Sequence, residues 1–362
     1  MKAPGNNTYF PSLTGVRAIA AYMVFIHHYR PFNINYFSKE IHFFFNEFHV
    51  GVTLFFVLSG FLIAYRYSEL NQFNFRNYMV NRIARIYPMY LILTTITFLS
   101  YFIIKEENSI HNLIIYFANI TFTRGFFENI VFSGIAQGWS LTVEETFYLL
   151  APVFFLLIKR KKINLVILPL LSIATGLLLV AIFGNINFYG FFGSNDLMFN
   201  YTFFGRAFEF FIGITLAVIY KQKLLRTTKI SFTYIGLLMI LISVYGLTLF
   251  KGDFDYGIRH PFGKFINTFF LPLFGVAFFY LGLLREKTIV SKLLATNLFV
   301  LLGKSSYIFY LIHIGIFATL IYRLIPNDFI LFLLINILSV LMFKYIEDPL
   351  NLYIRKKFKK RI

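Results

Sequence analysis

The sequence contains no cysteine and few charged residues. Because none of the 362 residues is Cys, disulfide bonds, thiolate metal sites and a cysteine-bound acyl intermediate are excluded. Charged side chains make up 14% of the chain, whereas an ordinary soluble domain has about 25%. A soluble protein of this length could not surround its apolar residues with so few charges. The composition therefore excludes a soluble enzyme, a disordered tail and a disulfide-stabilised scaffold.

Apolar residues take the place of the missing charges. They make up 58% of the chain, which at about 20 residues per span is enough for roughly ten transmembrane helices. We therefore predict an all-α integral membrane protein, in which residues 1–362 form a single polytopic domain. The first span has no signal-peptide cleavage site, so we expect it to be retained. The predicted spans are 13–29, 47–66, 84–104, 138–158, 163–183, 200–220, 230–250, 265–284, 299–322 and 328–347, with a short or re-entrant segment at 111–123.

The basic residues determine the predicted orientation. Lys and Arg number 34 against 16 Asp and Glu, a net charge of +18, but they recur in short clusters between apolar runs, so we predict no nucleic-acid partner. By the positive-inside rule, both termini lie in the cytoplasm, including a basic tail over 351–362. The clustered cations include Arg76, Arg82 and Arg85, then Lys159 to Lys162, then Lys221, Lys223, Arg226 and Lys229, then Arg285, Lys287 and Lys292. The longest connection predicted on the outer side of the membrane, 106–137, carries Glu106, Glu107, Arg124 and Glu128.

Ionisable residues inside the spans are functional candidates, since a charge at the centre of a bilayer costs at least about 2.5–3.5 kcal/mol. Arg17 and His28 lie eleven residues apart in the first span. At 100° per residue this is three turns plus about 20°, so both side chains point the same way, about 16 Å apart along the axis. His27 is expected to point away from that face. An arginine that reaches back to the interface, with an interfacial histidine, is the structural alternative.

Two further pairs of ionisable residues stand at the ends of predicted spans. Arg82 and Arg85 are three residues apart, so they share a helix face that could bind phosphate, although anchoring at the cytoplasmic interface explains them equally well. Glu144 and Glu145 follow Trp139 at the outer end of the fourth span. We predict that one of these carboxylates faces the bundle interior or a wet cavity.

The sixth and ninth spans carry the remaining polar candidates. Ser306, Tyr310 and His313 have helical spacing, which predicts one polar stripe. Arg206 and Glu209 are interpreted as an internal ion pair that lets both charges be tolerated in the membrane. A membrane histidine that arginines approach from the cytoplasm suits group transfer from a phosphorylated, anionic carrier. Histidine would then act as a general base or as a transient acyl acceptor.

Five segments of the chain match one protein family. They are LTGVRA at 13–18 leading to His28, GVTLFFVLSGF at 51–61, RIARIYP at 82–88, WSL at 139–141 with Glu144 and Glu145, and the stretch from SSY at 305–307 to LIH at 311–313. On these segments the chain resembles the membrane acyltransferase-3 family, the bacterial O-acyltransferases that modify surface glycans. The arginine and histidine of the first span combined with the Arg82/Arg85 pair are more specific than either alone.

The resemblance implies a fold, a donor and an acceptor. It implies ten spans with cytoplasmic termini in the bacterial inner membrane, acetyl-CoA or another acyl-CoA as cytoplasmic donor, and no metal. The acceptor would be a sugar hydroxyl on a lipid-linked or surface polysaccharide such as lipopolysaccharide. His28 would be the essential residue. Its supporting residues would be Arg17 and Glu144, with Arg82 and Arg85 binding the donor and Glu145, Ser59, Ser306, Tyr310 and His313 as further candidates.

Two departures from the family pattern qualify this expectation. Thr53 stands where relatives often carry an acidic residue, so a role for that position is in doubt. Many relatives also continue into an extracytoplasmic hydrolase-like domain, so this chain is expected to acylate the acceptor itself or to use a separate periplasmic transferase. The alternative functions are a flippase for lipid-linked oligosaccharides and, more weakly, a glycan polymerase.

Overall fold

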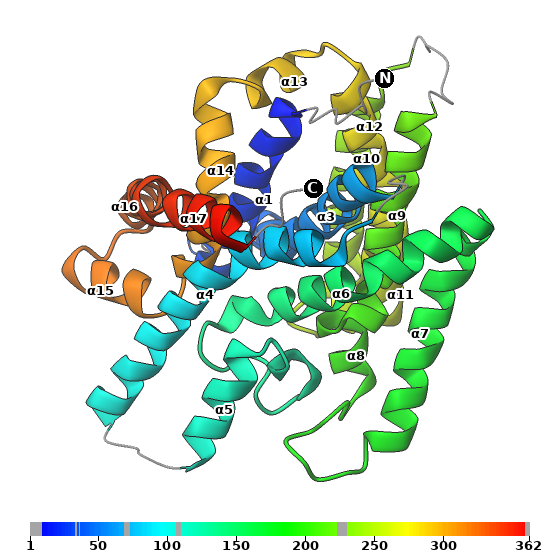
Figure 1. Cartoon of the computed structure of the whole chain (residues 1–362). Coiled ribbons are helices and arrows are strands. Elements are labelled where there is room, and N and C mark those ends of the chain that lie inside the picture. The colour runs from blue at the N-terminus through cyan, green and yellow to red at the C-terminus, as the bar shows by residue number, and fades with distance from the viewer. Residues whose placement is uncertain are drawn as a thin grey trace.

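The chain folds into an assembly of helices (Figure 1), here described from a computed structural model. The structure describes residues 9–32, 35, 37–68, 73–105, 110–222 and 230–358. Within these ranges there is no strand, and one isolated bridge pairs Phe127 with Phe191. Several predicted loop charges lie outside the described residues, namely Glu106, Glu107, Lys223, Arg226, Lys229 and the end of the basic tail at 359–362.

The helices follow one another with short connections. In the first half they are α1 (Pro11–Tyr29), α2 (Lys39–Asn46), η1 (Glu47–Val50), α3 (Gly51–Tyr67), α4 (Phe75–Lys105), α5 (Ile110–Ile120), η2 (Arg124–Phe126), η3 (Ala136–Gly138), α6 (Trp139–Arg160) and α7 (Asn164–Phe183). In the second half they are α8 (Asn195–Tyr201), α9 (Phe203–Lys221), α10 (Phe232–Phe250), η4 (Gly257–Arg259), α11 (Pro261–Phe265), η5 (Ile266–Val276), α12 (Ala277–Arg285), α13 (Ile289–Leu294), α14 (Asn297–Ile312), α15 (Ile316–Leu324), α16 (Asp328–Met342), η6 (Phe343–Glu347) and α17 (Asp348–Phe358).

The prediction of a helical, multi-pass membrane protein is confirmed. In the described part of the chain, eight helices or continuous helix series are long and apolar enough to cross a membrane, and the bent pair α14–α15 makes a ninth. Helix α1, with 19 residues, carries Arg17 and the two histidines and is not among these nine. All ten predicted spans fall on helices, whereas α5, with 11 residues, covers the segment predicted as short. The orientation of the termini stays a prediction.

The centre of the bundle is formed by α1, α3 and α9, with α14 beside α1. Close approach of α3 and α9 depends on glycine. A Cβ atom on Gly60 would lie 2.2 Å from the carbonyl oxygen of Phe210, and one on Gly213 would lie 2.1 Å from that of Val57. The outer helix α7 has the opposite character, because its exposed side chains are large and apolar, as a lipid-facing surface requires. They include Leu170, Leu171, Leu178 and Ile182.

The segment predicted as a span over 299–322 is broken near its middle. Helix α14 ends at Ile312, and α15 leaves it at an angle of 88°. The backbone turns at Gly315, whose φ of 94° is in the left-handed region that favours glycine. The amide of Gln137 donates hydrogen bonds of 2.8 Å to the carbonyl oxygens of Tyr310 and Leu311, which satisfies groups that the missing helical turn leaves open.

Candidate functional site

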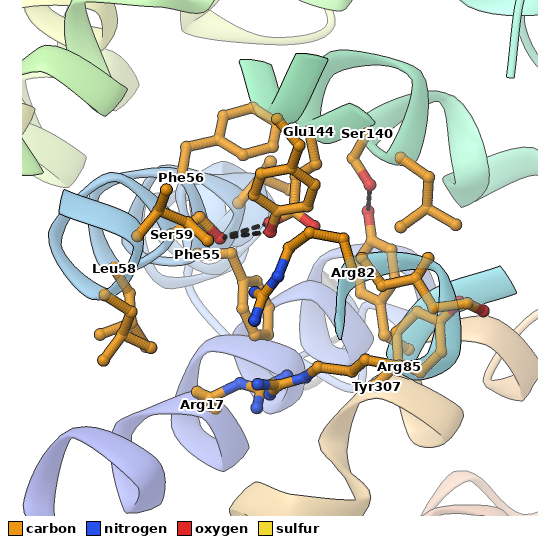
Figure 2. Close-up of a pocket in the computed structure, with 17 residues that line it drawn as sticks. Arg17, Phe55, Phe56, Leu58, Ser59, Arg82, Arg85, Ser140, Glu144 and Tyr307 are labelled. Carbon is orange, nitrogen blue, oxygen red and sulfur yellow. Dashed lines mark hydrogen bonds between the residues drawn. The ribbon is translucent and has the colours of Figure 1, made fainter. Parts of the chain in front are cut away.

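A cavity lined by arginines lies between α1, α3, α4, α6 and α14, and we call it the arginine cavity (Figure 2). It encloses about 760 Å³ of space between protein atoms, part of it open to the outside. Its lining brings together residues from these five helices. Its lining includes Arg17, Ser59, Arg82, Arg85, Glu144 and Tyr148, and an apolar wall of Phe55, Phe56, Leu58, Leu62, Ile63 and Ile86.

The three arginines have no anionic partner in direct contact. Across the described residues, no hydrogen bond or ion pair engages Arg17, Arg82 or Arg85. Arg82 is only 5% exposed, and its guanidinium lies 5.7 Å from the ring centre of Tyr148. In Figure 2, Arg17 and Arg85 point toward one another, and they are close enough to repel electrostatically. Three guanidinium groups crowded together in this way have the charge and the hydrogen-bond donors that could bind a multiply charged anion.

Glu144 lies in the arginine cavity. Ser59 donates a hydrogen bond of 2.6 Å to one carboxylate oxygen of Glu144, and the carboxylate is within electrostatic reach of Arg17 and Arg85. Neither Glu144 nor Glu145 lines the cavity that His28 lines, which is described next. Glu145 lines neither cavity, because neighbouring residues of a helix point about 100° apart.

A second cavity, which we call the histidine cavity, adjoins the arginine cavity, and side chains of α3 and α14 stand between the two. It encloses about 990 Å³ of partly open space, and Val52 and Tyr310 line both cavities. Arg17 and His28 of α1 therefore open into different cavities, although their spacing predicts one shared groove. The residues that line the histidine cavity include His27, His28, His49, Gln137, Trp139, Asn200, Tyr201, Arg206, Tyr256, Arg259 and Tyr310.

Four imidazole rings form a row, of which His49, His27 and His28 line this cavity while His313 is buried behind them. Ring centres are 5.4 Å apart for His49 and His27, 4.8 Å for His27 and His28, and 5.3 Å for His28 and His313. His27, predicted to point away from the face of Arg17 and His28, lines the same cavity as His28. There Nδ1 of His27 bonds the carbonyl oxygen of Asn46 at 2.5 Å.

The stripe predicted in the ninth span separates into different environments. The Tyr310 hydroxyl lies 3.0 Å from both the Ser140 hydroxyl and the Gln137 carbonyl oxygen. His313 is 0% exposed, follows the last residue of α14, and bonds the Tyr310 carbonyl through Nδ1 at 2.8 Å. Ser306 donates to the carbonyl of Gly303 within its own helix and lines neither cavity.

The predicted internal ion pair is confirmed. Arg206 donates hydrogen bonds of 2.7 and 2.8 Å to the two carboxylate oxygens of Glu209, and both side chains are at most 5% exposed. The Nη2 nitrogen of Arg206, which also bonds Glu209, donates to the Thr53 hydroxyl at 3.2 Å. Thr53 therefore occupies its unusual position as a neutral partner of this pair.

The model of a family described as an acyltransferase domain matches residues 10–345. The chain belongs to the acyltransferase-3 family. It is 28% identical over 378 residues to the O-acetyltransferase OatA of Staphylococcus aureus strain NCTC 8325, covering 96% of this chain and 58% of OatA. It is also 24% identical over 373 residues to SACOL0978 of strain COL, which is named provisionally as an O-acetyltransferase, covering 94% of this chain and 57% of that protein. The chain thus spans little more than half the length of these relatives. None of the solved structures is significantly similar.

Sequence reasoning missed part of this candidate site. Glu47, His49 and Tyr256 reach the histidine cavity or support it from η1 and from the loop before η4. Glu47 and His49 stand at the start of the second predicted span. Because an ionisable residue in a membrane is costly, their position could have marked them as candidates. Arg124, expected in an outer loop, is 0% exposed and donates to the Ile135 carbonyl oxygen. Within the described ranges, no three His, Cys, Asp or Glu side chains are arranged to hold a metal ion.

Proposed function

We propose that the protein is an O-acyltransferase of the bacterial cytoplasmic membrane. It takes an acyl group, with acetyl favoured, from cytoplasmic acyl-CoA and transfers it to a sugar hydroxyl of a lipid-linked or cell-surface polysaccharide. Membership of the acyltransferase-3 family and the names of the relatives support acyl transfer. The observation that carries the proposal is the pair of cavities, one lined by three unpaired arginines and one by histidines, that meet at Val52 and Tyr310.

The arginine cavity suits the donor. CoA carries a diphosphate and a further phosphate, and guanidinium groups bind phosphate oxygens in pairs of charge-assisted hydrogen bonds. Arg82 and Arg85 are proposed to hold these phosphates, with Arg17 beside them. The apolar wall that includes Phe55 and Leu62 would contact the long pantetheine arm and guide the thioester toward Tyr310. Glu144 balances part of the arginine charge and holds Ser59 in place.

The histidine cavity suits the reaction and the acceptor. His28 is exposed to this cavity at the end of α1. It is proposed to act either as the base that takes the proton of the acceptor hydroxyl, or as the nitrogen that carries the acyl group. Aromatic side chains of Trp139 and Tyr201 lie 5.0 Å apart, centre to centre, on the wall of the same cavity. They offer the flat apolar faces against which sugar rings pack.

A His28→Ala variant tests the proposal. The purified protein is mixed with acetyl-CoA and the glycolipid extract of the source cells, and CoA release is followed with a thiol reagent. Because the chain has no cysteine, the protein itself does not react with this reagent. We expect acyl-CoA-dependent CoA release and alkali-labile glycan esters from the wild type, and loss of both in the variant.

The matched control is His111→Ala, since His111 is exposed and lines neither of the two cavities. It should keep wild-type activity. Correct insertion of each variant is checked by its yield and its monodisperse elution in detergent. Persistent glycan esters in a well-inserted His28→Ala protein would refute the mechanism. Glycolipid binding that never depends on acyl-CoA would favour the flippase.

A further inference from the structure

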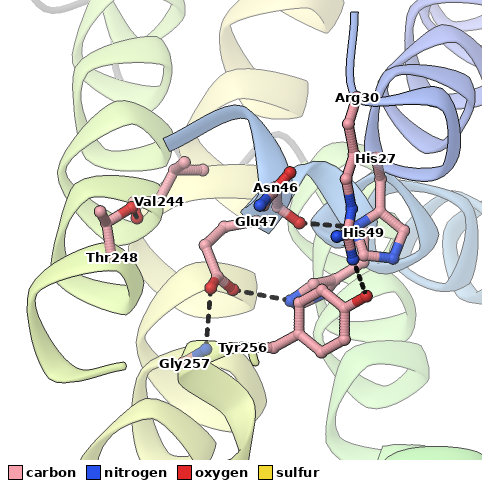
Figure 3. A network of polar contacts seen from close by, with 9 residues as sticks. All are labelled: His27, Arg30, Asn46, Glu47, His49, Val244, Thr248, Tyr256 and Gly257. Carbon is pink, nitrogen blue, oxygen red and sulfur yellow. Dashed lines mark hydrogen bonds and ion pairs between the residues drawn. The ribbon is translucent and has the colours of Figure 1, made fainter. Parts of the chain in front are cut away.

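A buried carboxylate holds one of the cavity histidines. Glu47 is 0% exposed, and one of its oxygens accepts a hydrogen bond of 2.9 Å from Nε2 of His49. Its other oxygen accepts a hydrogen bond of 2.8 Å from the backbone N–H of Gly257. Figure 3 shows both bonds, with Glu47 and His49 on η1 and Gly257, the first residue of η4, opposite them. Both carboxylate oxygens of Glu47 are therefore held by hydrogen bonds.

These contacts determine where the protons of His49 lie. An ionised carboxylate only accepts hydrogen bonds, so Nε2 of the neutral imidazole must carry the proton. Nδ1 then keeps a free lone pair, and the side chain of His49, 15% exposed, lines the histidine cavity. A carboxylate that fixes the tautomer of a histidine is the arrangement that general bases use in acyl transfer to or from hydroxyl groups.

His49 stands close to His28 without replacing it. The ring of His27 lies between them, with its centre 4.8 Å from His28 and 5.4 Å from His49. His27 is tied to the Asn46 carbonyl by Nδ1. Two histidines of one cavity thus face the same space, and only one of them is held by a carboxylate.

Building on the proposed function, we propose that His28 and His49 divide the reaction between them. In the first step a His28 nitrogen bonds the acyl carbon, the carbon–sulfur bond of the thioester breaks, and the departing sulfur takes the imidazole proton to give free CoA. In the second step the acceptor oxygen bonds the acyl carbon while Nδ1 of His49 takes the hydroxyl proton. The carbon–nitrogen bond to His28 then breaks, and the proton passes across the cavity to that nitrogen, which restores both histidines. Glu47 is the positioning residue for His49.

The structural alternative is that these contacts only fasten the start of η4 to η1, and two conservative variants separate these roles. The amide of His49→Gln can still donate to Glu47 but has no basic nitrogen. The amide of Glu47→Gln can still accept from Gly257 but carries no charge. A purely structural bond would survive both changes, whereas a base and its positioning residue would not.

The experiment measures the two steps separately. Purified protein is mixed with radiolabelled acetyl-CoA to follow CoA release and label bound to the protein. Vesicles of the source bacterium, with the chromosomal gene deleted and a variant supplied, report labelled glycan esters. We expect His49→Gln to release CoA once per molecule and retain the label, while glycan ester formation falls at least about 100-fold, as loss of a general base does. Glu47→Gln should lower kcat for ester formation without changing KM, and added imidazole should restore activity to His49→Ala.

Each of the following results would contradict either the role of His49 or the proposed function. Wild-type ester formation by His49→Gln, or loss of its single CoA release, would overturn the role of His49 as base of the second step. Failure of imidazole to restore any activity to a well-folded His49→Ala protein would also overturn it. If the wild type itself releases no CoA from acetyl-CoA, the proposed function fails, which is a different result from a defect confined to ester formation.

Discussion

Replacing Arg85 by Gln should weaken donor binding and, at the same time, stabilise the ligand-free protein. Arg85 is repelled by Arg17, which is the largest influence on it, and by Arg82, and it is attracted by the carboxylates of Glu347 and Glu144. At an effective dielectric constant of about 20, a neighbouring pair of like charges costs on the order of 2 kcal/mol. Net relief on the order of 1 kcal/mol should raise the Tm by about 2 °C. Loss of a charged phosphate contact, worth about 1.5–3 kcal/mol, should weaken acyl-CoA binding roughly 10- to 150-fold.

The assay is thermal unfolding in detergent with and without acetyl-CoA, together with the KM for acetyl-CoA. Arg76→Gln is the matched control, because Arg76 is on the same helix, is exposed, and does not line the arginine cavity. The wild type and the control should gain Tm on adding acetyl-CoA, and Arg85→Gln should lose most of that gain. A lower ligand-free Tm in Arg85→Gln would show that its charge stabilises the fold. Unchanged donor affinity would refute the assignment of the cavity to CoA.

Two further predictions concern buried and capping charges. Arg206→Met should destabilise the protein by about 3–5 kcal/mol, because it leaves Glu209 buried and unpaired. A second change, Glu209→Met, should restore most of the lost stability. Denaturant unfolding of the single and the double variant measures both effects. Burial raises the pKa of Glu286, but hydrogen bonds from the first residues of α10 outweigh it and hold the pKa below its usual value. Glu286→Gln should therefore lower stability by about 1 kcal/mol at pH 7, with a Tm difference that disappears as the pH falls through the folded-state pKa.

The sign of the Glu286 effect follows from linkage. A carboxyl whose pKa is lowered by folding contributes stability above its unfolded-state pKa, and this contribution is lost as the protein takes up the proton. A Tm difference that grew on acidification would contradict the role of the charge at α10. For the ion pair, a double variant no more stable than Arg206→Met would contradict the argument from an orphaned charge.

The polar residues of the first span show how far the sequence reaches into the site. Their spacing correctly assigns Arg17 and His28 to one helix, and their cost in a membrane marks them as candidates. It does not reveal that a partition at Val52 and Tyr310 separates them, because that partition is built by α3 and α14. Periodicity describes the faces of one helix and says nothing about which neighbours divide the space along it.

The same limit applies at the break in the ninth span. Hydropathy over 299–322 is continuous, so a sequence window sees one span. The helix stops because a distant amide, that of Gln137, satisfies its last carbonyl groups and because Gly315 can adopt a positive φ. Likewise, Glu47 meets Gly257 across 210 residues of sequence. Such contacts depend on tertiary packing and have no local signal.

The sequence by itself determined the class of the protein and the residues worth considering. A chain with no cysteine, 14% charged residues and 58% apolar residues must be solvated by a bilayer, and the few charges within its spans must be placed for a reason. Only the tertiary structure decided how those residues are grouped. It put Glu144 with the arginines and His27, His28 and His49 together in a second cavity. Composition and periodicity describe one helix at a time. A cavity is formed by side chains of several helices, and the sequence does not state how those helices are arranged in space.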